Sequence, residues 1–430
     1  MPKKVLIITY YWPPAGGIGV VRWVKFAKYL REHGWEPIIY TTSNGSYPLK
    51  DTSMEKDVPV DLKIIKRPIW EPFQFYQFLF GKKDGQTKLD DIKWKDKASL
   101  TQKISNWIRG NFFIPDARSF WVKPSIKYLT SYLNANPVDA IVSTGPPHSI
   151  HLIALGLKKK LSLPWLADFR DPWTTMDYYQ QLMLTSWANR KHLRLEAEVL
   201  NTADAVIVVG NGMKQEFEKK RHSKVMVIPN GFDEADFNNT TVELTAEFSI
   251  VYIGSFFERI NPIGLWKALN ELNKENHPLI KKLKIRLVGR TDQAVIQSIN
   301  EFGLSGLTEL ISYQPHEEAL RQMRTAQVLL LCVYEKTPWV LTGKLFEYFA
   351  ANRPILCIGP PHGDAAQAIS DAKVGQTFAS IDVAGIKENL KSLYARFESG
   401  QLNVDNTTSK LFSHRNLALR VSEILNEISS

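Results

Sequence analysis

The chain has 430 residues, of which 44% are hydrophobic and 23% are charged, and this composition excludes a mostly disordered or collagen-like protein. A single hydrophobic core stops growing at roughly 250–300 residues, so the length predicts two domains. The net charge of +10 comes from the first half, since residues 1–230 carry 34 Lys and Arg against 21 Asp and Glu, which indicates an anionic partner such as nucleic acid, a phospholipid surface or a lipid-linked phosphate.

Strands alternate with helices through the first half of the chain. Short apolar runs predict strands at residues 5–11, 37–42, 140–143, 165–168, 205–209 and 225–229. A helix is expected over residues 20–33, where Gly34 ends it. This alternation predicts a parallel sheet with helices on both faces. The polar residues that follow, up to Thr245, predict a linker.

The second half repeats the alternation. Strands are predicted at residues 248–253, 284–288, 307–313, 328–333 and 354–358, and helices at 263–273, 292–302, 317–324 and 343–351. We therefore expect an α/β protein with two doubly wound, Rossmann-like domains that face each other across a cleft, where strand ends and helix N-termini would bind a ligand.

The expected domain boundaries follow from this pattern. Residues 1–230 form the first domain and residues 231–411 the second, and the last segment, residues 412–430, contains a helix that packs back on the first domain. The longest apolar run near the middle of the chain, residues 326–334, is far shorter than the ~20 residues of a membrane span. The chain has two cysteines, Cys332 and Cys357, both in strand-like runs, which favours a reducing compartment. A cytoplasmic location is expected.

A glycine-rich loop follows the first strand. Gly16, Gly17 and Gly19 precede the first helix, so backbone N–H groups at the positive end of this helix could bind a phosphate of a donor substrate. The alternative is a plain tight turn. The loop has neither the GxGxxG pattern nor the Lys-Ser/Thr pair of a P-loop, which argues against a nicotinamide cofactor and a nucleoside triphosphatase.

Two further loops of the first half follow strands. His148 lies just past the strand at 140–143, where it could orient or donate to a bound hydroxyl or phosphate, whereas His151 one turn later is expected to pack. The spacing of this pair does not favour a metal site. Asp168, Arg170 and Asp171 either form a mutual ion-pair network or bind an acceptor sugar.

The strongest local signal begins at Thr342. Thr342 and Gly343 start a helix whose free N–H groups could bind a diphosphate, next to Lys344. One turn along, Glu347 could accept hydrogen bonds from both ribose hydroxyls of a nucleotide. The alternative is an exposed i, i+3 pair of Lys344 and Glu347, worth only ~0.2–0.5 kcal/mol. Tyr313 follows a strand where a base could lie.

Together these motifs resemble family 4 glycosyltransferases of the GT-B fold. The similarity covers nearly the whole length, through residues 16–19, 143–148, 227–233, 252–255 and 344–354. The resemblance implies an acceptor site on the first domain, a nucleotide-sugar site on the second that includes Gly254 and Ser255, and retaining transfer without a metal. It also suggests that the departing phosphate takes the acceptor proton. We expect a UDP- or GDP-linked donor, and the residues do not select one base over the other.

The sequence departs from the family pattern at two places. Trp339 occupies the position of the first of two glutamates, and Glu347 matches the second. Ser255 follows Gly254 where the family often has arginine, so we assign the diphosphate contact to the nearest cation, Arg259, and expect His148, Arg259 and Lys344 to act in catalysis. Cations at a departing diphosphate lower the barrier, and one such donor is typically worth ~3 kcal/mol.

Two segments of the first half have the pattern of a membrane-surface element. Residues 69–83 are rich in aromatics and end in Lys82 and Lys83, and residues 97–109 place Ile104, Trp107 and Ile108 on one helical face beside basic residues. We expect contact with an anionic membrane and a lipid-linked or cell-surface glycan acceptor, as in polysaccharide or lipopolysaccharide synthesis, with a peripheral location on the inner face of the plasma membrane. The alternative is an insertion that packs on the domain.

Other classes of function remain as alternatives. A nucleotide-sugar epimerase could share the fold and bind the same donor, and a catalytically inactive nucleotide-sugar-binding protein is suggested by Trp339. Nucleic acid is not an expected partner, because no recognition motif for it is present.

Overall fold

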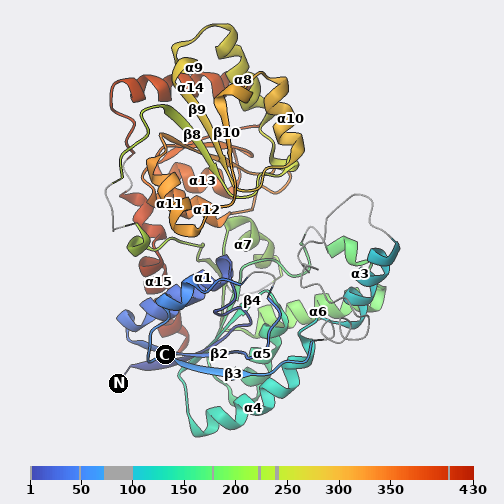
Figure 1. Cartoon of the computed structure of the whole chain (residues 1–430). Coiled ribbons are helices and arrows are strands. Elements are labelled where there is room, and N and C mark those ends of the chain that lie inside the picture. The colour runs from blue at the N-terminus through green and yellow to red at the C-terminus, as the bar shows by residue number, and fades with distance from the viewer. Residues whose placement is uncertain are drawn as a thin grey trace. The chain divides into compact units, whose positions relative to one another are not determined.

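A computed structural model describes residues 2–47, 50–71, 100–176, 179–220, 224–237, 242–404 and 407–430. The chain divides into two compact units (Figure 1). One consists of Met1–Pro229 with Leu417–Ser430, and the other of Asn230–Asn416. Of the two segments that the sequence assigns to a membrane surface, residues 72–83 and 97–99 lie outside the described part of the chain.

The first unit is built on a seven-stranded parallel sheet with the order β3-β2-β1-β4-β5-β6-β7. Its strands are β1 (Lys3–Ile8), β2 (Trp35–Thr42), β3 (Lys63–Arg67), β4 (Ala140–Gly145), β5 (Trp165–Phe169), β6 (Ala205–Val208) and β7 (Val225–Val227). Its helices are α1 (Ile18–Leu30), α3 (Leu100–Phe112), α4 (Val122–Ala135), α5 (Ser149–Leu161), α6 (Ser186–Thr202), α7 (Asn211–Glu218) and most of α15 (His414–Ile428).

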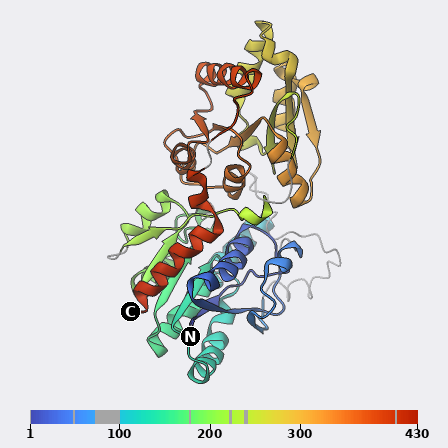
Figure 2. The same cartoon turned by 90° about the vertical axis from the view of Figure 1, so that its left-hand side faces the viewer.

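Both faces of this sheet are buried. Alternate residues of β1 point to opposite faces, so that Leu6 and Ile8 pack under α4 and α5, whereas Val5 and Ile7 pack under α1 and α15. The C-terminal helix lies along the first unit in Figure 2, and Leu417 and Leu425 of this helix are fully buried in that core. A sheet covered in this way exposes its functional side chains only at strand ends and in loops.

The second unit repeats the architecture with a six-stranded parallel sheet of order β10-β9-β8-β11-β12-β13. Its strands are β8 (Phe248–Ile253), β9 (Leu283–Val288), β10 (Thr308–Ile311), β11 (Val328–Cys332), β12 (Ile355–Ile358) and β13 (Gly375–Phe378). Its helices are α8 (Ile263–Lys274), α9 (Pro278–Lys282), α10 (Gln293–Glu301), α11 (His316–Thr325), α12 (Gly343–Ala350), α13 (Asp364–Ala372) and α14 (Val383–Glu398).

The predicted α/β class with two Rossmann-like sheets is confirmed. Every predicted strand is present to within a few residues, and two more, β3 and β13, were not predicted. Both lie at an edge of their sheet and are only partly buried, so neither shows the continuous apolar run of a strand covered on both faces. Among the described residues, the helices are too short or too polar to cross a bilayer.

Candidate active site

The loop after β8 in the second unit brings a glycine against a lysine from a distant helix. Gly254 has a φ of +109°, in the region that favours glycine, and a Cβ added there would lie 3.3 Å from Nζ of Lys344. Lys344 belongs to the first turn of α12, 90 residues further along the chain. The structure therefore brings together two residues that the sequence assigned to the donor site.

A buried tyrosine holds Lys344 in this position. The ammonium group of Lys344 donates a hydrogen bond of 2.7 Å to the hydroxyl of Tyr252, which in turn donates a bond of 2.9 Å to the carbonyl oxygen of Ser255. Tyr252 is almost fully buried and its ring stacks on Phe256. The sequence motif at 252–255 includes Tyr252 but gives it no role, because an aromatic residue in a buried strand has the pattern of a core residue.

The environment of Lys344 disfavours its charge. Burial lowers the pKa of the Lys344 ammonium to about 8, although the nearby groups Cys332 and Glu347 act in the opposite direction. Removal from water destabilises the charged form of a lysine, and an anion placed beside it would restore that charge. The site is therefore suited to bind a group of negative charge.

The N-terminus of α12 adds free polar groups beside Lys344. Thr342 is the N-cap residue, yet its side chain makes no capping hydrogen bond, and Oγ1 is a buried atom without a partner in the described chain. Gly343 is buried at the first position of the helix. Buried polar atoms are nearly always satisfied, so an orphaned hydroxyl at a helix N-terminus is consistent with a ligand site.

Glu347 is one turn further along α12 and has a partner that the sequence did not reveal. Its Oε1 atom lies 3.1 Å from Nε2 of His316, at the start of α11. The Glu347 side chain is 30% exposed, so the carboxylate is open to a ligand. Among the described residues its ion-pair partner is His316, and it also acts through its charge on Lys344. Tyr313, in the loop before α11, is 81% exposed.

The structure does not place Arg259 in contact with Lys344. Arg259 is exposed, and its guanidinium packs over the ring of Phe257, 5.6 Å from the ring centre. Ser255, also exposed, contributes its carbonyl oxygen to Tyr252. Trp339 is 40% exposed, and Glu335 accepts a hydrogen bond from the backbone N–H of Ser380.

In the first unit, the glycine-rich loop meets Arg170. Gly16 is half-buried, and Gly17 is exposed and is the N-cap residue of α1 with a φ of +104°. A Cβ added to Gly19 would lie only 1.5 Å from Nη1 of Arg170, so any larger residue there would displace the guanidinium. Arg170 is fixed by bonds from Nε to Thr144 and from Nη2 to the carbonyl oxygen of Pro146.

Asp168 is fully buried and pairs with Arg22 of α1 at 3.0 Å, rather than with its neighbour Arg170. The same carboxylate accepts hydrogen bonds from Nε1 of Trp23 and from the Thr144 hydroxyl. These contacts favour a structural role for Asp168. Asp171 is half-buried, and burial raises the pKa of its carboxyl group.

His148 is held between aromatic rings. Its imidazole stacks on Trp173 with ring centres 5.0 Å apart, and only 7% of the residue is exposed. Burial lowers the pKa of His148 to about 4, so the ring is neutral at pH 7. His151 is fully buried and shares a hydrogen bond of 2.8 Å with Ser143, which agrees with the expectation that it packs.

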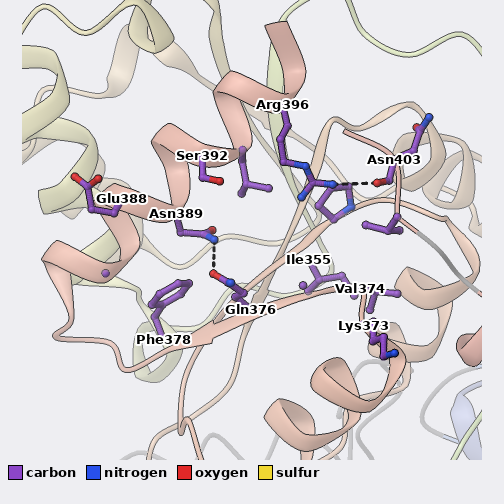
Figure 3. A pocket seen from close by; sticks show the side chains of 15 residues that line it. Ile355, Lys373, Val374, Gln376, Phe378, Glu388, Asn389, Ser392, Arg396 and Asn403 are labelled. Carbon is purple, nitrogen blue, oxygen red and sulfur yellow. Dashed lines mark hydrogen bonds between the residues drawn. The ribbon is translucent and has the colours of Figure 1, made fainter. Parts of the chain in front are cut away.

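A pocket of about 610 Å³ lies elsewhere in the second unit, between the edge strand β13 and α14 (Figure 3). None of the predicted site residues lines it. Two of its polar side chains bond to residues of the same pocket, with Asn389 donating to Gln376 and Arg396 donating to the carbonyl oxygen of Asn403. In the described part of the chain, no group of three or more His, Cys, Asp or Glu residues is arranged to hold a metal ion.

Residues 96–236 match the model of Glycosyltransferase Family 4. This match, over 141 of the 430 residues, supports the resemblance that the sequence motifs indicate. The chain matches no curated protein sequence.

Solved structures share the fold over nearly the whole chain. A glycosyltransferase from Rickettsia africae superposes with a TM-score of 0.62 at 14% identity, covering 99% of this chain and 98% of that one. WaaG, a glycosyltransferase involved in lipopolysaccharide biosynthesis, gives 0.54 at 14% identity, with 98% and 99% covered. A putative UDP-N-acetylglucosamine 2-epimerase from Listeria monocytogenes gives 0.56 at 11% identity, with 98% and 95% covered. The two Rossmann-like units are thus those of the GT-B fold.

Proposed function

We propose that the protein is a glycosyltransferase that moves a sugar, with retention of configuration, from a UDP- or GDP-linked donor to a hydroxyl of a lipid-linked or cell-surface glycan. The observation that carries the donor assignment is the cluster at the start of α12. There Lys344 lies against the Gly254 loop, and Glu347 presents a carboxylate one helical turn away. A cation and helix N–H groups suit a diphosphate, and a carboxylate suits the two hydroxyls of a ribose.

In such a transfer, the protein lowers the barrier mainly by stabilising the leaving group. As the glycosidic bond breaks, the departing nucleoside diphosphate gains negative charge, which Lys344 and the N-terminus of α12 would stabilise. Arg259 is a second candidate cation. We propose that the departing phosphate accepts the proton of the acceptor hydroxyl and that no divalent metal is required, so activity should persist in a chelator.

In the first unit, His148 and the Gly16–Gly17 loop are candidates for contacts with a substrate. His148 is neutral at pH 7, so it can donate one hydrogen bond to a hydroxyl without adding a charge. Arg170 and Asp171 remain candidates for the acceptor, whereas the carboxylate of Asp168 is already engaged within the protein.

A lipid-linked acceptor is supported by the surface of α3. Ile104, Trp107, Ile108 and Phe112 are between 38% and 68% exposed. Large apolar side chains in this number are unusual on a water-facing helix. Phospholipid interfaces bind helices of this kind, with aromatic and aliphatic residues on one face and cations beside them.

Helix α6 extends this surface. Asn111 of α3 accepts a hydrogen bond from the backbone N–H of Thr185, the N-cap residue of α6, and His192 of α6 contacts the carbonyl oxygen of Gly110. Trp187 on α6 is 58% exposed, with the ammonium group of Lys191 over its ring. Residues 100–113 and 183–195 contain five Lys or Arg and no Asp or Glu. This charge is complementary to anionic headgroups and supports a peripheral location on the cytoplasmic face of a membrane.

Vesicle co-sedimentation tests the membrane part of the proposal. Wild-type protein should bind phosphatidylglycerol vesicles and dissociate from them at high salt. The double variant Lys191→Glu/Arg194→Glu should bind at least thirtyfold more weakly, because each cation near an anionic surface contributes about 1 kcal/mol. Lys281→Glu/Lys282→Glu on α9 of the second unit is the matched control. Equal binding of all three proteins would refute the docking surface.

Product analysis separates transfer from the epimerase alternative. Incubation with a panel of UDP- and GDP-sugars should release UDP or GDP only when an acceptor is present. Conversion of a nucleotide sugar to its epimer without any acceptor would support the alternative. Tight nucleotide-sugar binding without either product would support an inactive binding protein.

A further inference from the structure

We infer that Tyr252 is a positioning residue for the donor diphosphate, and that it acts by fixing the ammonium group of Lys344 at the Gly254 loop. The inference rests on the proposed function. A buried tyrosine would thus hold a cation beside Gly254, where the next residue in the loop is the uncharged Ser255.

The hydrogen-bond directions around Tyr252 allow one arrangement. The hydroxyl proton of Tyr252 is used in the 2.9 Å bond to the carbonyl oxygen of Ser255. Its lone pair therefore faces Lys344, which donates along the 2.7 Å contact. Burial raises the pKa of Tyr252 well above its usual range, so the hydroxyl keeps its proton at neutral pH.

The ring of Tyr252 is itself held in place. It stacks on Phe256 with ring centres 4.1 Å apart and an interplanar angle of 16°. The ammonium of Lys344 lies 4.0 Å from the centre of the Tyr252 ring, so the cation contacts both the hydroxyl and the ring face. A flexible lysine side chain is thereby ordered before any ligand binds, which reduces the entropy cost of binding.

Two protons of the Lys344 ammonium remain for a ligand after the bond to Tyr252. The other titratable groups that affect Lys344 are Cys332 on β11 and Glu347 on the same helix. The Lys344 pKa of about 8 means that an anionic ligand binds most strongly below that pH, where the ammonium is charged.

A double-mutant cycle tests the inference, with UDP and GDP as calorimetric probes at pH 7. Tyr252→Phe should weaken nucleotide binding about tenfold, since hydrogen bonds that involve a charged group are among the stronger ones. In a Lys344→Met background, the same change should alter affinity less than twofold, because the tyrosine acts through the lysine. Tyr40→Phe is the matched control. This buried tyrosine of the first unit bonds to Ser125 and should leave affinity unchanged.

The pH profile supplies a second measurement that a purely structural role would not change. Wild-type affinity should fall as the pH rises from 7 to 9, and Lys344→Met should remove this dependence. A tenfold loss of nucleotide affinity for Tyr252→Phe in both backgrounds, or no loss in either, would overturn the inference. The proposed function would be unaffected as long as the wild type binds a nucleotide. If the wild type binds neither nucleotide, the proposed function fails, and this inference fails with it.

Discussion

Replacing Asp168 with asparagine should destabilise the first unit without any change in a substrate contact. The side chain is fully buried and pairs with Arg22, which is equally buried. Asparagine keeps the shape but removes the charge, so the Arg22 guanidinium is left without a compensating anion. Nε1 of Trp23 also loses a charged acceptor at 2.7 Å.

The expected cost follows from the burial of both partners. Breaking a buried ion pair from one side typically costs about 3–5 kcal/mol. For a unit of this size, 1 kcal/mol shifts the midpoint of thermal unfolding by about 2–4 °C. Asp168→Asn should therefore lower the unfolding temperature of the first unit by about 6–20 °C. The double variant Asp168→Asn/Arg22→Met should recover part of this loss, because both buried charges are then absent.

Calorimetry of the full chain measures this effect, since two units can unfold in separate transitions. Only the transition of the first unit should move. Nucleotide affinity should be retained at a temperature where the variant is folded. If the free energy of unfolding of the variant is within about 1 kcal/mol of the wild-type value but transfer activity is lost, the reasoning is refuted. Asp168 would then be an acceptor-binding residue.

Two further predictions concern the first unit. The folded-state pKa of His148 is about 4, below its unfolded value of 6.5, so its stability contribution is complete above pH 6.5 and is lost as the pH falls toward 4. Unfolding measured across this window should show a decrease of roughly 3 kcal/mol from this residue, absent in His148→Phe. Gly19→Ala places a Cβ against the guanidinium of Arg170 and should lower the free energy of unfolding in urea by about 1–3 kcal/mol. Gly400→Ala, in the second unit, is the control: at a φ of +68° it strains only its own backbone and should leave the stability of the first unit unchanged.

The arrangement of elements could be predicted because a covered parallel sheet leaves a direct mark on the sequence. Residues 248–253 form an apolar run in which Ser249 is the one polar residue, and β8 has these bounds in the structure. Edge strands lack such an apolar run. The strand β3, with the sequence KIIKR, exposes three of its five residues and resembles a surface loop.

The candidate site residues stand out singly in the sequence, but their partners do not. Lys344 and Glu347 stand out as polar groups at a helix start, whereas the contacts with Tyr252 and His316 join segments that lie 92 and 31 residues away. Arg22 illustrates the same limit. Its position in a helix of mixed polarity gives no sign that it is fully buried and paired with Asp168 across 146 residues. Charge pairs between distant segments depend on the fold and leave no local pattern.

The central claim is that the ribose and diphosphate of a nucleotide bind at α12. Titration calorimetry of UDP and GDP against the wild type and Glu347→Gln tests it most directly. The wild type should bind one of the two nucleotides, and the variant should bind about 10–100-fold more weakly with unchanged thermal stability, because one charge-assisted bond to the ribose is lost. Equal affinity in the two proteins, or no binding by the wild type at millimolar nucleotide, would contradict the claim.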